Sequence, residues 1–224
     1  MKEKLKEIKQ SFRLYMNGVT AQSLRDKGVN YHLNWGVSLQ HLQEMTAEIK
    51  AEGHTPAELH ELSILLWKEN IRECKILATM LMPADTFPAD LAMLWVEQTP
   101  TQEIAELAAM NLYQHLPYAK DMALQLIAQP YEMAQLQGYC IMARLLSTKM
   151  VLNDSELNEF IDQAHSTFKS LAVKGQLSKD KGQESSIFNV QCSISLRHSI
   201  LNAIQKLSQH TPHLNDYFEV AFFA

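Results

Sequence analysis

Apolar residues recur at three- and four-residue spacing along nearly the whole chain, and this spacing predicts α-helices from end to end. Residues that interrupt helices are scarce, because glycine and proline each occur only seven times in 224 residues. No segment shows a convincing strand pattern. Hydrophobic residues make up 46% of the chain, which is enough to fill a substantial core. The sequence therefore predicts an all-α fold.

Helix start signals divide the chain into segments. TPAE (55–58) and TPTQ (99–102) each offer a threonine cap at Thr55 or Thr99, followed by proline and then Glu or Gln at the third helical position. Asn153 with Glu156 offers a similar box, and so does Asn70 with Glu73, which would divide LSILLWKENIRECKILATMLM (62–82) into two helices. The predicted helices cover residues 2–16, 20–27, 36–51, 56–67, 71–82, 88–97, 100–115, 118–128, 130–147, 154–172 and 185–207.

These helices are expected to form a series of hairpins. LLW (65–67) and MLW (93–95) end two of them 28 residues apart, and QLI (125–127) ends a third about one repeat later. Repeats this short cannot bury their apolar faces alone, so each must stack on its neighbours. We expect a right-handed α-solenoid of HEAT-like antiparallel helix pairs, an armadillo-type superhelix, in a single domain over 1–224. Its longest polar interruption, AVKGQLSKDKGQ (172–183), is expected to be a flexible loop.

Several classes of site and location are disfavoured by the sequence. MKEKLKEIKQ lacks the apolar core of a signal peptide, and no later stretch reaches the ~18 to 20 apolar residues of a membrane span, so a soluble, cytoplasmic protein is expected. Cys74, Cys140 and Cys192 lie far apart without a CxxC pair, which favours reduced core thiols. The nine histidines form no metal-ligand pattern, and neither a metal nor another cofactor is expected.

Positive charge is concentrated near the amino terminus of a chain whose net charge is -5. Residues 1–27 carry seven basic groups against three acidic ones, and a helix over 1–16 would present much of this charge. Lys2, Lys6, Lys9 and Arg13 are therefore candidates for contacts with DNA phosphates. The alternative is the ordinary solvated face of an amphipathic helix whose apolar side holds Leu5, Ile8, Phe12 and Tyr15.

Two long stretches resemble a known family. GVNYHLNWGVSLQHLQEMTAEI (28–49) and ELSILLWKENIRECKILATMLM (61–82) are similar to the amino-terminal half of the AlkD-like DNA alkylation repair glycosylases, a HEAT-repeat family. In that family a Gly-Val pair leads a helix, and a Leu-Trp pair precedes a helix with this Arg, Glu and Ala pattern. Most matching residues have scaffold roles, and Trp67 is expected to lie in the core.

The resemblance implies excision of alkylated purines from DNA held in the concave face of the solenoid. It also implies a carboxylate that stabilises positive charge developing on the sugar. The family motif falls on TQEIAE (101–106), which places Glu106 at the catalytic aspartate and Gln102 at an essential tryptophan. Glu103 shares a helix face with Glu106 and is a weaker catalytic candidate. Gly138 stands at the position of a cleft arginine, and Ile194 at that of a second tryptophan.

These substitutions leave two functional hypotheses from different classes. The first is a DNA alkylation repair-like protein that binds duplex DNA and releases little or no alkylated purine. The second is a non-catalytic helical scaffold that binds a protein or peptide in its concave groove. The helix amino terminus offers both carboxylates an alternative, structural role, because acids there interact favourably with the helix dipole. The apolar tail DYFEVAFFA (216–224) is expected to pack on the last helix or to enter a dimer contact.

Overall fold

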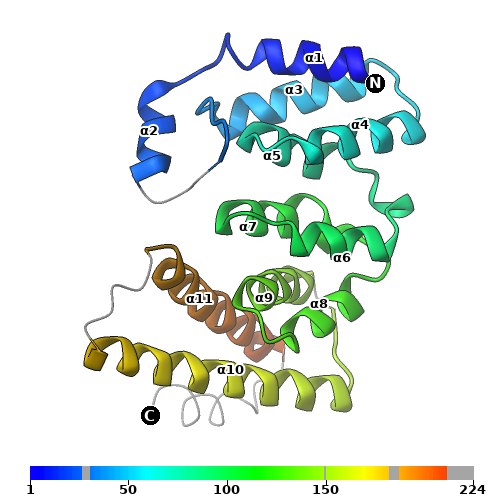
Figure 1. Ribbon diagram of the computed structural model, residues 1–224. Coiled ribbons are helices and arrows are strands. Elements are labelled where there is room, and N and C mark those ends of the chain that lie inside the picture. The colour runs from blue at the N-terminus through cyan, green and yellow to red at the C-terminus, as the bar shows by residue number, and fades with distance from the viewer. Residues whose placement is uncertain (27–30, 149, 182–186, 211–224) are drawn as a thin grey trace. The chain divides into compact units, whose positions relative to one another are not determined.

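The computed structural model describes residues 1–26, 31–148, 150–181 and 187–210, without the side chains of 172–181, 187–193 and 210. These ranges hold eleven α-helices and two short 3-10 helices (Figure 1). The only β-type pairing within them is an isolated parallel bridge between Leu33 and Ile71, so the all-α prediction is confirmed. The helices are α1 (Lys2–Ser11), α2 (Gly18–Asp26), α3 (Leu39–Ala51), α4 (Pro56–Lys68), α5 (Arg72–Leu81), η1 (Ala84–Thr86), α6 (Ala89–Glu97), α7 (Gln102–Asn111), η2 (Tyr113–His115), α8 (Ala119–Ile127), α9 (Glu132–Ser147), α10 (Asp154–Lys181) and α11 (Ile187–His210).

Two predicted capping boxes are confirmed. The Thr55 hydroxyl accepts from the Glu58 amide, and the Glu58 carboxylate accepts from the Thr55 amide. Asn153 and Glu156 exchange the same pair of hydrogen bonds at the start of α10, each 2.9 Å long. In both boxes the partners are three residues apart, so local sequence specifies the whole contact.

Two other predicted caps are wrong. The Thr99 hydroxyl donates to the Trp95 carbonyl at the end of α6, while Thr101 caps α7 by accepting from the Ile104 amide. The start of α5 has no side-chain cap, because the cap position is Ile71 rather than Asn70. The Glu73 carboxylate, expected to complete that box, is instead bound by backbone amides of residues 35 and 37.

The first compact unit comprises Met1–Pro117, and its helices pack on near neighbours in the sequence. α4 and α5 pack together, α3 and α7 contact α5, and α1 contacts α4 (Figure 1). In its core the Trp67 ring stacks on Trp95, with ring centres 4.2 Å apart and planes 4° apart. Both indoles are 2% exposed, so the predicted burial of Trp67 is confirmed. Cys74 is also fully buried, as expected of a core thiol.

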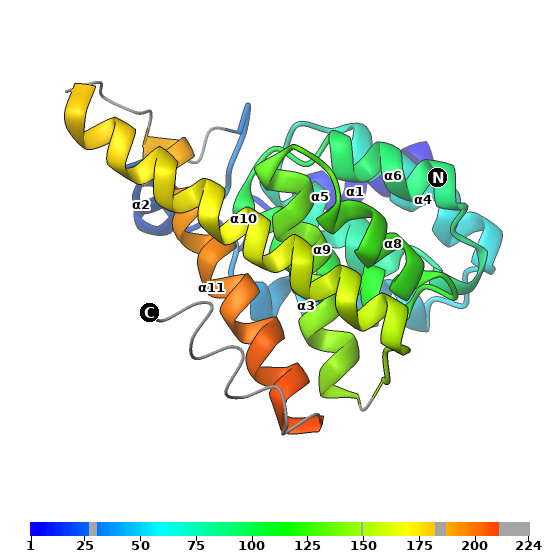
Figure 2. The ribbon, with the colours of Figure 1, turned by 90° about the horizontal axis from the view of Figure 1, so that it is seen from below.

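The second compact unit comprises Tyr118–Ala224. α9 packs against α8 and α11, and α10 contacts both α8 and α11 (Figure 2). Packing between helices that are near neighbours in the sequence, within each unit, is the arrangement that an α-solenoid has. The handedness of a superhelix, the HEAT-like pairing and the single-domain organisation stay predictions.

The helix α10 is longer than the sequence analysis predicts. It continues through residues 172–181, most of the segment expected to be a flexible loop, while residues 182 and 183 lie outside the described ranges. The segment contains no proline, and one glycine costs a helix only about 1 kcal/mol, so its polarity alone does not end the helix. The side chain of Cys192 and the tail 216–224 also lie outside the description. No helix in the described part is both long and apolar enough to cross a membrane.

Candidate functional site

A sharp turn at Gly36 precedes α3 and shapes the best-defined polar site of the first unit. Gly36 has a φ of +70°, in the left-handed region that side chains rarely adopt. A Cβ atom at this position would lie 2.2 Å from the Asn17 carbonyl oxygen and 2.8 Å from the Ala21 amide nitrogen. Only glycine therefore lets this turn approach the start of α2.

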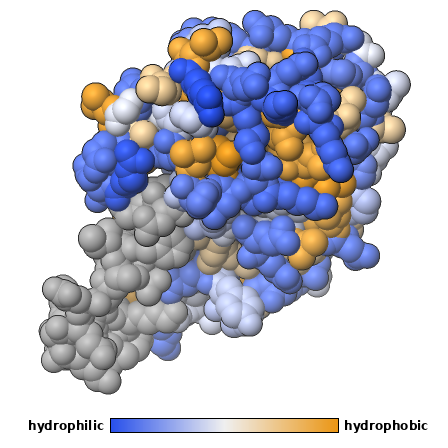
Figure 3. All heavy atoms as spheres, turned by 45° about the horizontal axis from the view of Figure 1, so that its top comes forward, coloured by the Kyte–Doolittle hydropathy of each residue, from blue (hydrophilic) through white to orange (hydrophobic). Residues whose placement is uncertain are grey.

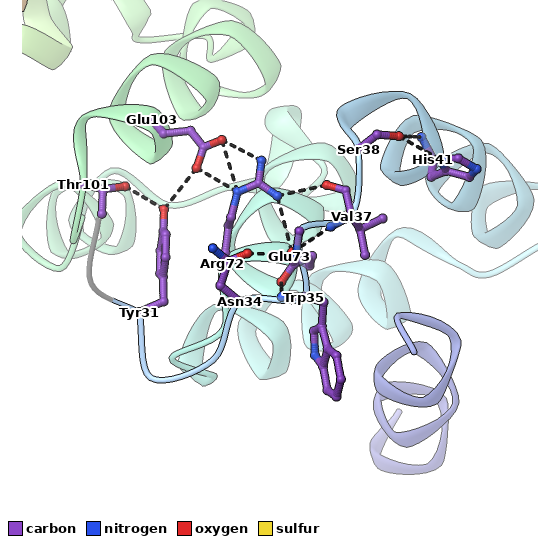
Figure 4. A network of polar contacts seen from close by, with 11 residues as sticks. Tyr31, Asn34, Trp35, Val37, Ser38, His41, Arg72, Glu73, Thr101 and Glu103 are labelled. Carbon is purple, nitrogen blue, oxygen red and sulfur yellow. Dashed lines mark hydrogen bonds and ion pairs between the residues drawn. The ribbon is translucent and has the colours of Figure 1, made fainter. Parts of the chain in front are cut away.

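The buried carboxylate of Glu73 lies inside this turn (Figure 4). One oxygen accepts from the Trp35 amide and the other from the Val37 amide, both at 3.2 Å. The side chain is 0% exposed, and a buried carboxylate is tolerated only where charges or hydrogen bonds compensate for lost hydration. Glu73 thus anchors the turn at residues 35–37 to the first turn of α5.

Arg72 connects this turn to α7. Its guanidinium donates from Nη1 to the Val37 carbonyl at 3.0 Å, and the same nitrogen lies 3.4 Å from Glu73. Nη2 and Nε bind the two carboxylate oxygens of Glu103 at 2.6 and 2.9 Å. Burial alone would lower the pKa of Arg72, but its bonds to Glu103 and the charge of Glu73 raise that pKa overall. Arg72 is therefore a permanently charged link between the two acids.

Tyr31 completes the network shown in Figure 4. Its hydroxyl lies 2.7 Å from the Thr101 hydroxyl and donates to Glu103 over 3.4 Å. Burial and then the negative charge of Glu103 raise the pKa of Tyr31, so the phenol stays protonated. The network formed by Tyr31, Arg72, Glu73, Thr101 and Glu103 holds the segment 31–37, α5 and α7 together.

The catalytic candidates on α7 have different surroundings. Glu103 is the acid bound by Arg72, and its side chain is 26% exposed. Glu106 is half-buried and accepts a 2.8 Å hydrogen bond from Gln102, one helical turn earlier. Gln102, which stands at the position of the family's tryptophan, is thus a hydrogen-bond partner of the candidate carboxylate Glu106.

The other two substituted cleft positions lie in the second unit. Gly138 is buried where α9 meets α8, and a Cβ atom there would lie 2.9 Å from the Ala123 carbonyl oxygen and from two atoms of Ile127. Close helix packing is therefore a sufficient reason for glycine at this position. Ile194 lies on α11 and is 50% exposed, two residues before the fully buried Leu196.

The candidate DNA-binding residues on and after α1 also differ from one another. Lys9 forms an ion pair of 2.7 Å with Glu69, and the Arg13 guanidinium lies 5.8 Å from the centre of the Trp35 ring. Lys2 and Lys6 are exposed. Three of these four cations, Lys2, Lys6 and Arg13, are therefore open to solvent, while Lys9 already has an acidic partner.

Neither Arg72 nor Tyr31 is a predicted site residue, and the predicted role of Glu73 is helix capping. The available signal was the adjacent pair Arg72 and Glu73 inside a strongly apolar stretch, since charges buried in such surroundings must be paired. Two side-chain donors of the segment 31–37, Asn34 Nδ2 and Trp35 Nε1, are buried and have no hydrogen-bond partner among the described residues. Over that same part of the chain, no cluster of three or more His, Cys, Asp or Glu side chains is arranged to hold a metal ion.

Comparison with known proteins supplies one match. The family model described as DNA alkylation repair enzyme matches residues 7–135. This range includes the buried network and the motif at 101–106, and it ends before Gly138 and Ile194. Neither the curated proteins nor the solved structures contain a match to the chain. Because the family model covers more than half of the sequence, the chain belongs to the DNA alkylation repair enzyme family.

Proposed function

We propose that this family member binds DNA and does not excise alkylated purines. The observation that carries the proposal is the pairing of Glu103 with Arg72, which uses both carboxylate oxygens in bonds of 2.6 and 2.9 Å. An acid neutralised in this way stabilises the fold of the first unit. It offers little negative charge to a sugar on which positive charge develops.

Glu106 is the remaining candidate for the catalytic carboxylate. One of its oxygens accepts from Gln102, and its side chain is one methylene longer than the aspartate of the family motif. A displacement of ~1 Å at a reacting centre can reduce a rate on the order of a hundredfold. With Gln102 in place of tryptophan, the position offers no aromatic surface against which a sugar and base would be fixed.

Binding of DNA is supported by the family and by the exposed cations of the first unit. Lys2 and Lys6 are four residues apart and therefore lie on one side of α1, and Arg13 follows in the turn after this helix. A row of cations on one side suits a row of phosphates. A peptide-binding scaffold, the other hypothesis from the sequence, gives no reason for this positive row on a chain of net charge -5.

The test combines an excision assay with a binding assay. Purified protein is incubated with methylated duplex DNA, and released 7-methylguanine and 3-methyladenine are measured by chromatography. We expect no release above the rate without protein, together with binding of unmodified duplex at low ionic strength. Robust excision that Glu106→Gln abolishes would overturn the non-excising part of the proposal. Absence of any DNA binding at low salt would overturn the DNA-binding part.

A further inference from the structure

Two chain segments in the first unit meet on the surface, one between α1 and α2 and the other before and within α3. The Asn17 amide donates to the Trp35 carbonyl at 2.9 Å, which holds the segments together. Arg13 lies over the Trp35 ring, and the Tyr15 ring lies 4.6 Å from His41 at an angle of 37°. We call Arg13, Tyr15, Trp35 and His41 the aromatic surface.

Large apolar side chains reach solvent next to the aromatic surface. Tyr15 is 44% exposed, and its neighbours Leu14 and Met16 are 81% and 62% exposed. Val19, at the start of α2, is 83% exposed. Figure 3 shows hydrophobic atoms reaching the surface among hydrophilic ones on the side of the molecule where α2 lies. Exposed apolar groups gathered in one short segment indicate a binding surface, whereas scattered ones need no explanation.

Two residues of the aromatic surface are positioned by hydrogen bonds from the rest of the first unit. Ser38 caps α3, and its hydroxyl lies 2.7 Å from His41 Nδ1, which fixes the orientation of the imidazole. The Trp35 amide is bound by the buried carboxylate of Glu73, and the Trp35 side chain extends away from that network (Figure 4). The His41 ring and the backbone of Trp35 are therefore already ordered, so the surface loses less conformational freedom when a ligand stacks on it.

Positive charge accompanies the aromatic rings. Arg13 belongs to the aromatic surface, and the exposed Lys2 and Lys6 precede it on one side of α1. Cations that follow a phosphate backbone, next to rings on which bases stack, are the combination that proteins use to bind single-stranded nucleic acid. A wholly apolar protein surface would complement the rings but would leave these cations without partners.

We propose that the aromatic surface binds unpaired nucleotides of DNA. A base stacks on the exposed ring of Tyr15, beside His41, and Arg13 and Lys6 contact the adjoining phosphates. Bases within a duplex already stack on one another and do not present a face to Tyr15, so the surface prefers a single-stranded tail or gap. This inference rests on the proposed function, because it names the part of a DNA ligand that the first unit recognises.

Fluorescence anisotropy at low ionic strength tests the inference with two labelled probes. One is a blunt duplex, and the other is the same duplex with a short unpaired thymine tail. We expect the wild-type protein to bind the tailed probe more tightly. Because one base stacked on an aromatic ring changes affinity by roughly tenfold, Tyr15→Leu should lose about that factor for the tailed probe only. Tyr131→Leu, which alters a tyrosine 69% exposed in the second unit, is the matched control and should change neither affinity.

The outcomes separate this inference from the proposed function. Equal affinity of the wild type for both probes, with no effect of Tyr15→Leu, would overturn the stacking surface and leave duplex binding intact. Failure to bind either probe would overturn the proposed function as well. A change in the sedimenting mass of Tyr15→Leu at unchanged DNA affinity would instead identify the surface as a contact between two copies of the chain. Circular dichroism establishes that each variant is folded.

Discussion

Arg72 binds both carboxylate oxygens of Glu103, and through its third nitrogen it also contacts the fully buried Glu73. This arrangement makes Arg72 the only guanidinium among the described residues with two carboxylate partners. One residue of α5 thereby connects the turn at Gly36 with the start of α7. The acids expected to act in chemistry and in helix capping are thus joined in one structural network.

Replacing Arg72 should destabilise the protein more than replacing Glu103. Arg72→Met leaves the Glu73 carboxylate buried without its cation, and breaking a buried ion pair from one side costs about 3 to 5 kcal/mol. Glu103→Gln keeps an oxygen that accepts from Arg72, and this position is partly exposed, so we expect a cost of about 1 kcal/mol. Urea unfolding followed by circular dichroism measures both. Equal costs would show that Glu73 does not depend on Arg72.

The network also marks the limit of what local sequence predicts. The boxes at Thr55 and Asn153 were predictable because each donor and acceptor pair lies within one helical turn. The true partners of Glu73 are amides 38 and 36 residues away, and no local pattern distinguishes them from the cap at Asn70. The helices could be predicted because the spacing of apolar residues reflects which side of each helix is buried. The pairing of charged residues depends on tertiary contacts, which the spacing does not reveal.

The role of Gly138 in the second unit also depends on tertiary packing that the sequence does not reveal. The family alignment assigned this position to a missing cleft arginine, but the space around it is filled by α8. A sequence contains no record of how closely two helix backbones approach, so a packing glycine and a missing functional residue look alike. Similarly, the polar composition of 172–181 suggested a loop, although α10 continues to Lys181.

Substituting Gly138 should therefore disturb packing. In Gly138→Ala the new methyl group would lie 2.9 Å from the Ala123 carbonyl oxygen, and overpacking of this kind typically costs about 1 to 3 kcal/mol. Gly18→Ala is the matched control, because nothing lies within 4 Å of a Cβ atom at Gly18. Thermal unfolding of the two variants should differ by several degrees. A Gly138→Ala variant as stable as Gly18→Ala would show that α8 and α9 separate at little cost.

The Cys74 thiol should make stability fall at alkaline pH. Burial raises the pKa of Cys74 above its ordinary value of 9.0. Below pH 9 the thiol is protonated in the folded and the unfolded chain, so its full contribution is present there. Above pH 9 only the unfolded chain releases the proton, and the free energy of unfolding falls by up to about 1.4 kcal/mol per pH unit from this group.

Unfolding by urea at pH 8 and pH 10 checks this effect. Cys74→Ala should lose less stability than the wild type between these two pH values. Ile76→Val truncates a buried, non-titrating neighbour on the same helix and should lower stability equally at both. If the free energy of unfolding fell equally in the wild type and in Cys74→Ala, the Cys74 thiol would not be the source of the alkaline loss of stability.

The cations of α1 should contribute unequally to DNA binding. Lys2 and Lys6 are exposed, so charge reversal at both positions should weaken duplex binding and flatten its dependence on salt, since fewer counterions are released. Removing one phosphate interaction lowers the slope of log K against log salt by about 0.9. Lys9 is already paired with Glu69 at 2.7 Å, so Lys9→Gln should leave this slope nearly unchanged. The same variant breaks a partly exposed ion pair and should cost at most about 1 kcal/mol of stability.

A salt titration of duplex affinity compares the wild type, the Lys2→Glu/Lys6→Glu double variant and Lys9→Gln. If Lys9→Gln flattened the slope as much as the double variant, Lys9 would have to leave Glu69 for a phosphate. If the affinity of the wild type did not change with salt, the cations on α1 would not contact DNA phosphates, because neutralised phosphates must release their counterions.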